Sequence, residues 1–219
     1  MEFIDLPPML QAAGSVRLPG SKSISNRVLL LAALAEGDTL VEALLDSDDT
    51  RVMRNAIVAL GVEVAEEGEA LRVSGCGGRF PKLRADIFVG NSGLSIRTLV
   101  PAIVACLSGG DDAAAEVRLS GVPRMHERPI GDLVDGLKQL GARVEWLGEP
   151  GYPPLALKPA LLGAERVSVR GNVSSQFLTG LLQAAPLVAR EKPLVIEVEG
   201  ELISRPYVEI TLNLMERFG

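Results

Sequence analysis

The sequence predicts an α/β protein made of three repeated βαβαββ units that pack around shared helices, with the third unit truncated. Two observations lead to this fold class. Strand-like and helix-like stretches alternate along the chain, separated by many of its 23 glycines and 14 prolines. In addition, the glycines expected to end the second helix of each unit, Gly61, Gly141 and Gly219, recur at intervals of 80 and 78 residues.

The first unit, about residues 15–75, is expected to contain all six elements. Apolar residues three or four apart predict its two helices, which end at Gly37 and Gly61. Residues 47–50 supply side-chain oxygens that can cap the second helix. The first two strands are predicted at residues 15–18 and 39–44, and the two helices at residues 24–35 and 52–60. The two strands of the hairpin are predicted at residues 62–64 and 71–73.

The second unit, about residues 85–160, repeats this order. We expect Pro129 in the first turn of the second helix, where its missing N–H has no partner to lose. Residues 75–84 and 155–165 are expected to be connecting loops. The strands of this unit are predicted at residues 87–89, 117–119 and 143–146, and its helices at residues 90–107 and 128–140.

The third unit, about residues 165–219, begins in the same way. A strand at residues 167–169 leads to a helix that opens at residues 172–175, and a strand at residues 195–198 leads to a helix at residues 204–218. The closing hairpin of the other units does not follow. The chain is therefore expected to be part of a longer protein.

Charge and composition exclude several classes of function. The 22 basic and 28 acidic residues give a net charge of −6, which argues against a nucleic-acid partner but allows small anions to bind a local basic patch. Cys76 and Cys106 form no C-x-x-C motif and His126 is the only histidine, so neither a zinc site nor a Ser-His-Asp triad is expected. We expect no metal and no cofactor. Chemistry must then rest on Lys, Arg, Ser and carboxylates.

The opening residues and the hydropathy predict a soluble, cytoplasmic protein that is not exported. No apolar run approaches the roughly 18 residues of a spanning helix. The first five residues also place no basic flank before an apolar stretch. No membrane partner is expected.

The first helix of every unit begins in small polar residues, at residues 21–27, 91–93 and 174–176. A helix start presents unpaired N–H groups and a partial positive charge, and nearby hydroxyls can complete the shell around a phosphate or carboxylate. If rotation relates the units, the three starts face one region. The alternative is that these serines and asparagines are ordinary N-caps.

Two basic clusters accompany these starts. Lys22, in the turn before its helix, and Arg27, on the first helical turns, are placed to reach one ligand. Arg124 and Arg128 precede a helix, where positive charge is unfavourable unless an anion lies against it. Alternatively, these arginines pair with Glu127, Asp132 or Asp135. His126 is expected to be a loop residue without a chemical role.

Five motifs, in order, resemble the signatures of the 5-enolpyruvylshikimate-3-phosphate synthase family, and together they cover nearly the whole chain. They are LPGSKSISNR at residues 18–27, GNSG at residues 90–93 with Arg97, PRM and ERPI within residues 123–130, GNVSSQFLT at residues 171–179, and SRPY at residues 204–207.

The resemblance implies an enzyme that transfers the enolpyruvyl group of phosphoenolpyruvate to the 5-hydroxyl of shikimate-3-phosphate and releases phosphate. In such enzymes two domains of three units each close over the substrates. This chain matches the first half only, so residues 21–219 would form one domain and residues 1–20 would be a strand or linker segment of the missing second domain. The family's acidic catalytic residues belong to that second half.

The family's site residues transfer onto matching positions of this sequence. Shikimate-3-phosphate would be held by Ser23, Arg27, Ser174, Ser175, Ser204 and Tyr207. Phosphoenolpyruvate would contact Gly93, Arg128 and Gln176, with Arg124 nearby. Lys22 would touch phosphoenolpyruvate and assist proton transfer.

Two positions depart from the family pattern. Leu94 stands where the family commonly has Thr, and Thr98 where it commonly has Pro. Both adjoin the expected phosphoenolpyruvate pocket, which glyphosate also occupies in this family. A bulkier Leu94 and the lost proline ring would shift Gly93 and weaken glyphosate more than substrate, so the enzyme is expected to be glyphosate-insensitive.

Two other readings remain open. The sister enzyme that transfers enolpyruvate to a UDP-amino sugar (UDP-N-acetylglucosamine) shares the fold and the lysine, but usually has Lys-Asn at the place of Lys22-Ser23 and a reactive cysteine in a mobile loop. Here Cys106 falls on an apolar helix, where a buried structural thiol is expected. A different class is a non-catalytic half-domain that binds a phosphorylated metabolite.

Overall fold

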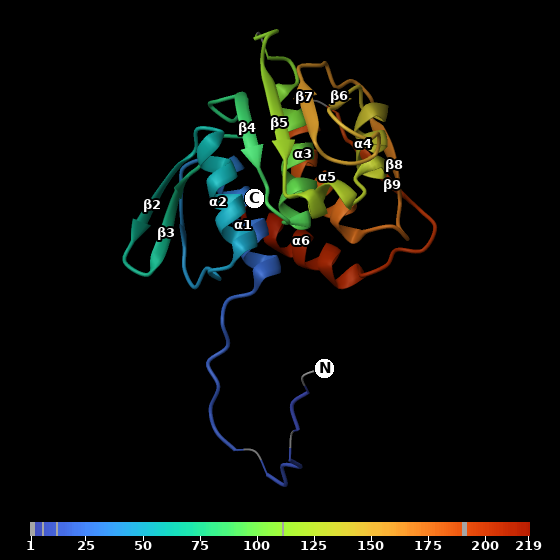
Figure 1. The fold of residues 1–219 in the computed structure, drawn as a ribbon. Helices are drawn as coiled ribbons and strands as arrows, with labels where there is room; N and C mark the ends of the chain where they lie inside the picture. The colour runs from blue at the N-terminus through green and yellow to red at the C-terminus, as the bar shows by residue number, and fades with distance from the viewer. Residues whose placement is uncertain (1–2, 6, 12, 111, 190–191) are drawn as a thin grey trace.

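The computed structural model describes residues 3–5, 7–11, 13–110, 112–189 and 192–219. The helices and strands of these ranges follow one another largely in the order that the sequence predicts (Figure 1). They are α1 (Lys22–Leu34), β1 (Asp38–Val41), α2 (Asp48–Ala59), β2 (Glu63–Glu67), β3 (Ala70–Ser74), β4 (Arg84–Phe88), α3 (Gly93–Leu107), β5 (Glu116–Ser120), the 3₁₀ helix η1 (Pro123–Glu127), α4 (Gly131–Gln139), β6 (Arg143–Trp146), β7 (Leu155–Lys158), β8 (Arg166–Arg170), α5 (Ser175–Val188), β9 (Val195–Glu199) and α6 (Arg205–Arg217).

The second unit shows the complete βαβαββ order. Its sheet has the strand order β4-β5-β7-β6, with β4 parallel to β5 and β7 antiparallel to both of its neighbours. The prediction of a loop at residues 155–165 is therefore wrong at its start, because Leu155–Lys158 is the strand β7. Leu155, Ala156 and Leu157 are all buried, so the strand lacks the apolar–polar alternation of a half-exposed strand.

The first unit pairs β1, β3 and β2 in one antiparallel sheet, and the predicted hairpin is confirmed as β2 and β3. The strand predicted at residues 15–18 is wrong. No described strand pairs with this segment, and Val16 and Leu18 are 84 % and 81 % exposed. An alternating pattern alone does not make a strand, since a strand is stabilised by the hydrogen bonds of a neighbour.

The third unit contains the parallel strands β8 and β9, joined through α5 and followed by α6. Within the ranges that the structure describes, no hairpin closes this two-stranded sheet. Its four elements match the four that the sequence predicts.

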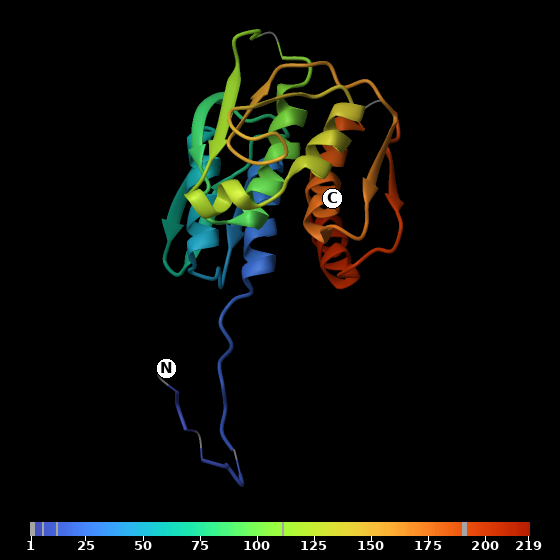
Figure 2. The same cartoon turned by 45° about the vertical axis from the view of Figure 1, so that its right-hand side comes forward.

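The first helices of the three units form the centre of the molecule (Figures 1 and 2). Every residue of α3 is buried, and most of its side chains are apolar. The contact between α3 and α5 is close, because a Cβ atom on Gly180 would lie 2.1 Å from the backbone oxygen of Arg97. One apolar core runs through all three units, as the prediction of shared helices requires.

The second helices end as the glycine spacing predicts. Gly61, Gly141 and Gly219 follow α2, α4 and α6 with φ angles of 89°, 106° and 90°, a left-handed conformation that glycine adopts without strain. The start of α4 differs from expectation, since Ile130 is its N-cap and Pro129 lies before the helix. No helix in the described ranges is long and apolar enough to span a membrane.

Candidate functional site

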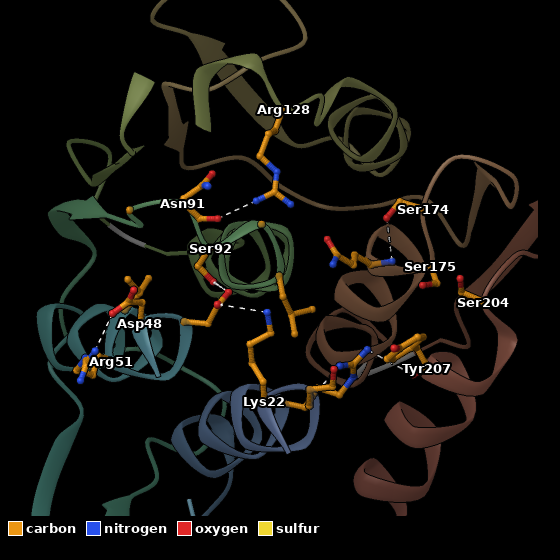
Figure 3. A pocket seen from close by; sticks show the side chains of 18 of the residues that line it. Lys22, Asp48, Arg51, Asn91, Ser92, Arg128, Ser174, Ser175, Ser204 and Tyr207 are labelled. Carbon is orange, nitrogen blue, oxygen red and sulfur yellow. Dashed lines mark hydrogen bonds and ion pairs between the residues drawn. The ribbon is translucent and has the colours of Figure 1, made fainter. Parts of the chain in front are cut away.

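The surface contains a hollow of about 1110 Å³ onto which the starts of α1, α3 and α5 open (Figure 3). We call this hollow the anion pocket. Its lining residues come from all three units: Lys22, Ser23, Arg27, Asp48, Asp49, Arg51, Val52, Asn55, Gly90, Asn91, Ser92, Gly93, Leu94, Val122, Arg128, Val173, Ser174, Ser175, Gln176, Ile203, Ser204 and Tyr207. The prediction that the three helix starts face one region is confirmed.

Serine caps each of these helices. The Oγ atoms of Ser21, Ser92 and Ser174 accept backbone N–H groups of the first turns of α1, α3 and α5. These serines are therefore ordinary N-caps, and this role does not prevent the same helix starts from binding an anion. Each helix start adds about half a positive charge to the pocket, so the three together strengthen the attraction for an anion.

The pocket is basic although the protein is acidic. Four cationic side chains line it against two carboxylates, those of Asp48 and Asp49. One of the cations, Arg51, is already neutralised by Asp46 and Asp48 at 3.0 and 2.6 Å. The cations that remain belong to Lys22, Arg27 and Arg128, which are three of the predicted site residues.

Arg27 is 2 % exposed and joins α1 to α5 and α6. Its guanidinium donates to Thr211 Oγ1 at 2.8 Å, Thr179 Oγ1 at 3.0 Å, the Ser23 carbonyl at 2.9 Å and the Tyr207 carbonyl at 3.4 Å. No carboxylate of the described residues pairs with it. Burial lowers the pKa of Arg27 to about 10, which leaves the group charged at neutral pH. This buried charge favours a negative ligand beside it.

Gly93 and Arg128 lie directly against each other at the start of α3. Arg128 donates to the Asn91 carbonyl at 2.7 Å, and a Cβ atom on Gly93 would lie 2.2 Å from Arg128 Nη2. The absence of a side chain at Gly93 therefore gives room to the guanidinium as well as access to the backbone N–H groups of the helix start. The structure thus places Gly93 and Arg128 together at the pocket.

Lys22 is the first residue of α1 rather than part of the preceding turn. Its Nζ atom lies 3.4 Å from Asp49 Oδ2, at the start of α2. The other carboxylate oxygen of Asp49 accepts a hydrogen bond from Ser92 Oγ at 2.6 Å. Asp49 was not among the predicted site residues, because its contacts come from two other helices.

Arg97 is a second residue to which the sequence assigned no role. It is 7 % exposed and donates to Gln176 Oε1 at 2.8 Å and to the Pro129 carbonyl at 2.7 Å. Its guanidinium lies 5.4 Å from the ring centre of Phe177. Burial, followed by the nearby charge of Arg128, lowers the pKa of Arg97 to about 10. Its place four residues after the GNSG motif was the only signal in the sequence, and its hydrogen bond to Gln176 holds that side chain at the pocket.

The third unit contributes hydroxyl groups to the opposite wall. Ser174, Ser175, Ser204 and Tyr207 line the pocket there (Figure 3). Ser204 has a φ angle of 54° and caps no backbone group of α6 through its side chain. A left-handed serine is uncommon and strained, and such strain concentrates at functional sites.

Arg124 is the one predicted site residue that the structure does not bring to the pocket. It lies in η1, its side chain is exposed, and it pairs with Glu127. The alternative interpretation, that these arginines pair with nearby carboxylates, therefore holds for Arg124, whereas Arg128 lines the pocket. His126 lies in η1 rather than in a loop as predicted, and its Nε2 accepts the Gly121 N–H at 3.4 Å.

The two positions that depart from the family pattern lie one helical turn apart in α3. Leu94 is 7 % exposed and lines the pocket beside Gly93. The hydroxyl of Thr98 donates back to the Leu94 carbonyl at 3.1 Å and contacts the Ser95 carbonyl at 3.3 Å. A proline at position 98 could not make these bonds, so the substitution changes how the first turn of α3 is held.

Comparisons with known proteins agree with this geometry. The family model of EPSP synthase (3-phosphoshikimate 1-carboxyvinyltransferase) matches residues 8–219. The 3-phosphoshikimate 1-carboxyvinyltransferase of Ralstonia pickettii is 60 % identical over 221 residues, which cover 100 % of this chain and 49 % of the relative. That of Bordetella petrii is 60 % identical over 220 residues, covering 99 % and 48 %.

A solved structure gives the same result for the fold. The EPSP synthase of Acinetobacter baumannii superimposes with a TM-score of 0.68 at 25 % identity, covering 80 % of this chain and 38 % of that one. The chain spans about half the length of the curated relatives that it matches. By the extent of these matches, the chain belongs to the EPSP synthase (3-phosphoshikimate 1-carboxyvinyltransferase) family.

Proposed function

We propose that this chain forms one half of a cytoplasmic enzyme that transfers the carboxyvinyl group of phosphoenolpyruvate to the 5-hydroxyl of shikimate-3-phosphate and releases phosphate. One observation carries the proposal. The starts of α1, α3 and α5 and the cations Lys22, Arg27 and Arg128 surround a single pocket. Both substrates are anions, and this arrangement suits two anions bound side by side.

The pocket has two chemically different sides. We assign phosphoenolpyruvate to the side of Lys22, Gly93, Arg128 and Gln176, where cations and helix N–H groups can neutralise a carboxylate and a phosphate. Shikimate-3-phosphate is assigned to the side rich in hydroxyls, with Arg27 beneath it. That side contains Ser23, Ser174, Ser175, Ser204 and Tyr207.

The addition requires two proton transfers, and the elimination that follows requires a third. A proton is added at the methylene carbon of phosphoenolpyruvate, the 5-hydroxyl oxygen attacks the neighbouring carbon, and the hydroxyl proton is lost. The tetrahedral intermediate then expels phosphate while its new methyl group loses a proton, which restores the double bond. Lys22 can supply a proton or stabilise the developing charge, while Arg128 neutralises the departing phosphate.

We also propose a division of the chain. Residues 21–219 form the substrate-binding domain, in units of about 15–75, 85–160 and 165–219, and residues 1–20 pack against the rest of the longer protein. The exposed apolar side chains of Phe3, Leu10, Val16 and Leu18 support this. The N-terminal segment also runs away from the body of the molecule (Figures 1 and 2).

The test uses this chain together with the remaining half of the full-length protein. Phosphate release is measured with both substrates, and calorimetry measures shikimate-3-phosphate binding to this chain alone. Turnover only in the presence of both halves supports the proposal. Useful affinity for shikimate-3-phosphate without turnover in the assembled protein would instead identify a non-catalytic binding half-domain.

A further inference from the structure

A carboxylate at the floor of the anion pocket has no place in the substrate assignment above. Asp49, in the first turn of α2, is one-quarter exposed and faces the same space as Lys22 and Arg128. A negative charge at this position repels both anionic substrates. The carboxylate must therefore serve a purpose other than substrate binding, and the side chains that it contacts indicate that purpose.

Asp49 connects the starts of three helices. Its Oδ2 atom lies 3.4 Å from Lys22 Nζ on α1, and its Oδ1 atom accepts from Ser92 Oγ, the N-cap of α3, at 2.6 Å (Figure 3). The Oγ atoms of Ser92 and Ser95 lie 2.6 Å apart, and Asn26 Nδ2 donates to Ser95 Oγ at 2.8 Å. The carboxylate is thus fixed from one side by a buried hydrogen-bond network and faces the lysine on the other.

The neighbouring carboxylate lies in the same first turn of α2 but does not contact Lys22 or the cap of α3. Asp48 is 94 % exposed and pairs with Arg51 at 2.6 Å on the rim. The only ion pair that Lys22 makes with any described residue is the one with Asp49. Lysine has a flexible four-carbon stem, so a fixed counter-charge is an effective means of holding its ammonium in one direction.

We propose that Asp49 is a positioning residue for Lys22, oriented by Ser92, and that it holds the lysine ammonium toward the reacting carbons of phosphoenolpyruvate. The inference rests on the proposed function for its catalytic consequence, and on geometry alone for the positioning itself. In this inference Asp49 acts through Lys22 and contacts no reacting atom.

The variant D49N separates charge from shape. Asparagine keeps the oxygen that accepts from Ser92 but presents an NH₂ group to the ammonium, so Lys22 loses its partner while the fold is kept. We expect kcat to fall about 10- to 100-fold, the range of a misplaced proton-transfer group. The KM for phosphoenolpyruvate should stay the same or fall, because a repelling charge is gone. D49E should recover part of kcat, and D135N, which removes the same charge from an exposed position of α4 outside the pocket lining, should behave as the unchanged protein.

Two measurements test the inference. The first is kcat and KM of the assembled two-half enzyme with these variants. The second is NMR relaxation of the Lys22 side-chain ammonium in the ligand-free 219-residue chain, which reports how well that side chain is ordered. The inference predicts an ordered Lys22 in the unchanged chain and in D135N, and a mobile one in D49N.

Equal order of Lys22 in D49N and in the unchanged chain overturns the inference, whatever the kinetics. An increase of KM with unchanged kcat also overturns it, since that result assigns Asp49 to substrate binding. If the unchanged assembly shows no turnover, the proposed function fails, and the relaxation measurement still decides whether Asp49 positions Lys22. Thermal unfolding of each variant identifies a loss of fold.

Discussion

Replacing Gly93 by alanine adds one methyl group at the start of α3, where it meets Arg128. The new Cβ atom would lie 2.2 Å from Nη2 and 2.4 Å from Cζ of that side chain, whereas ordinary contact begins at 3.4 Å. The guanidinium must therefore retreat by about 1.2 Å, which breaks its 2.7 Å hydrogen bond to the Asn91 carbonyl.

This substitution is expected to change the free energy of unfolding little and the binding of phosphoenolpyruvate strongly. The free energy of unfolding should change by less than about 1 kcal/mol, because the displaced group is the flexible end of a side chain and alanine is the better helix former. Binding of phosphoenolpyruvate should weaken about 10- to 100-fold, since a charge-assisted contact contributes about 1.5–3 kcal/mol. Affinity should thus fall without loss of stability.

Calorimetry with phosphoenolpyruvate and urea unfolding measure the two quantities on the same preparation. Gly163→Ala is the matched control, because a Cβ atom there would meet nothing within 4 Å. Unchanged affinity in Gly93→Ala would show that Arg128 does not bind the ligand. A loss of affinity that accompanies general unfolding would refute the separation of binding from stability.

Three further substitutions test other parts of the account. Arg27→Met should lower the free energy of unfolding by about 2–3 kcal/mol, because three hydrogen bonds from α1 to α5 and α6 and one within α1 are lost, whereas Arg54→Met, which removes one ion pair at the surface, should change it by less than about 0.5 kcal/mol; equal urea midpoints would contradict this. Gly180→Ala should destabilise the chain by about 1–3 kcal/mol, since its Cβ atom would lie 2.1 Å from backbone of α3, and a melting temperature within error of the unchanged chain would disprove that contact. In the complete enzyme, Leu94→Thr with Thr98→Pro should lower the glyphosate concentration for half-inhibition about tenfold; unchanged sensitivity would refute the role of these two positions.

Local sequence signals were sufficient for most of the fold. The positions of Gly61, Gly141 and Gly219 predicted three units because a helix C-terminus needs a left-handed residue, and this need is local. The strand β7 was missed because Leu155–Lys158 lies between β5 and β6 and is apolar at three successive positions. Its identity as a strand depends on neighbours that the local pattern does not contain.

The candidate site likewise contains residues that the local sequence predicts and residues that it does not. Lys22 and Arg128 could be predicted because each lies close in sequence to a helix start or its motif. Asp49 and Arg97 could not be given roles, since their partners Ser92 and Gln176 are 43 and 79 residues away. Only the packing of α1, α2, α3 and α5 brings these pairs together.

Arg124 illustrates the opposite case. Its motif and its place before a helix predicted a ligand contact, yet the turn of η1 directs it to Glu127 on the surface. A charge three residues away in a helical turn is a ready partner, and the sequence alone gives no means to choose between that partner and a distant pocket.

The central claim is that three homologous helix starts bind one pair of anionic metabolites. Amide chemical shifts of the 219-residue chain, followed by NMR during titration with phosphoenolpyruvate and then shikimate-3-phosphate, test it most directly. The account predicts that amides at Ser23, Gly93 and Ser175 shift in the same titrations. Shifts at a single helix start, or shifts confined to the opposite end of the helices around Ser108, would contradict it.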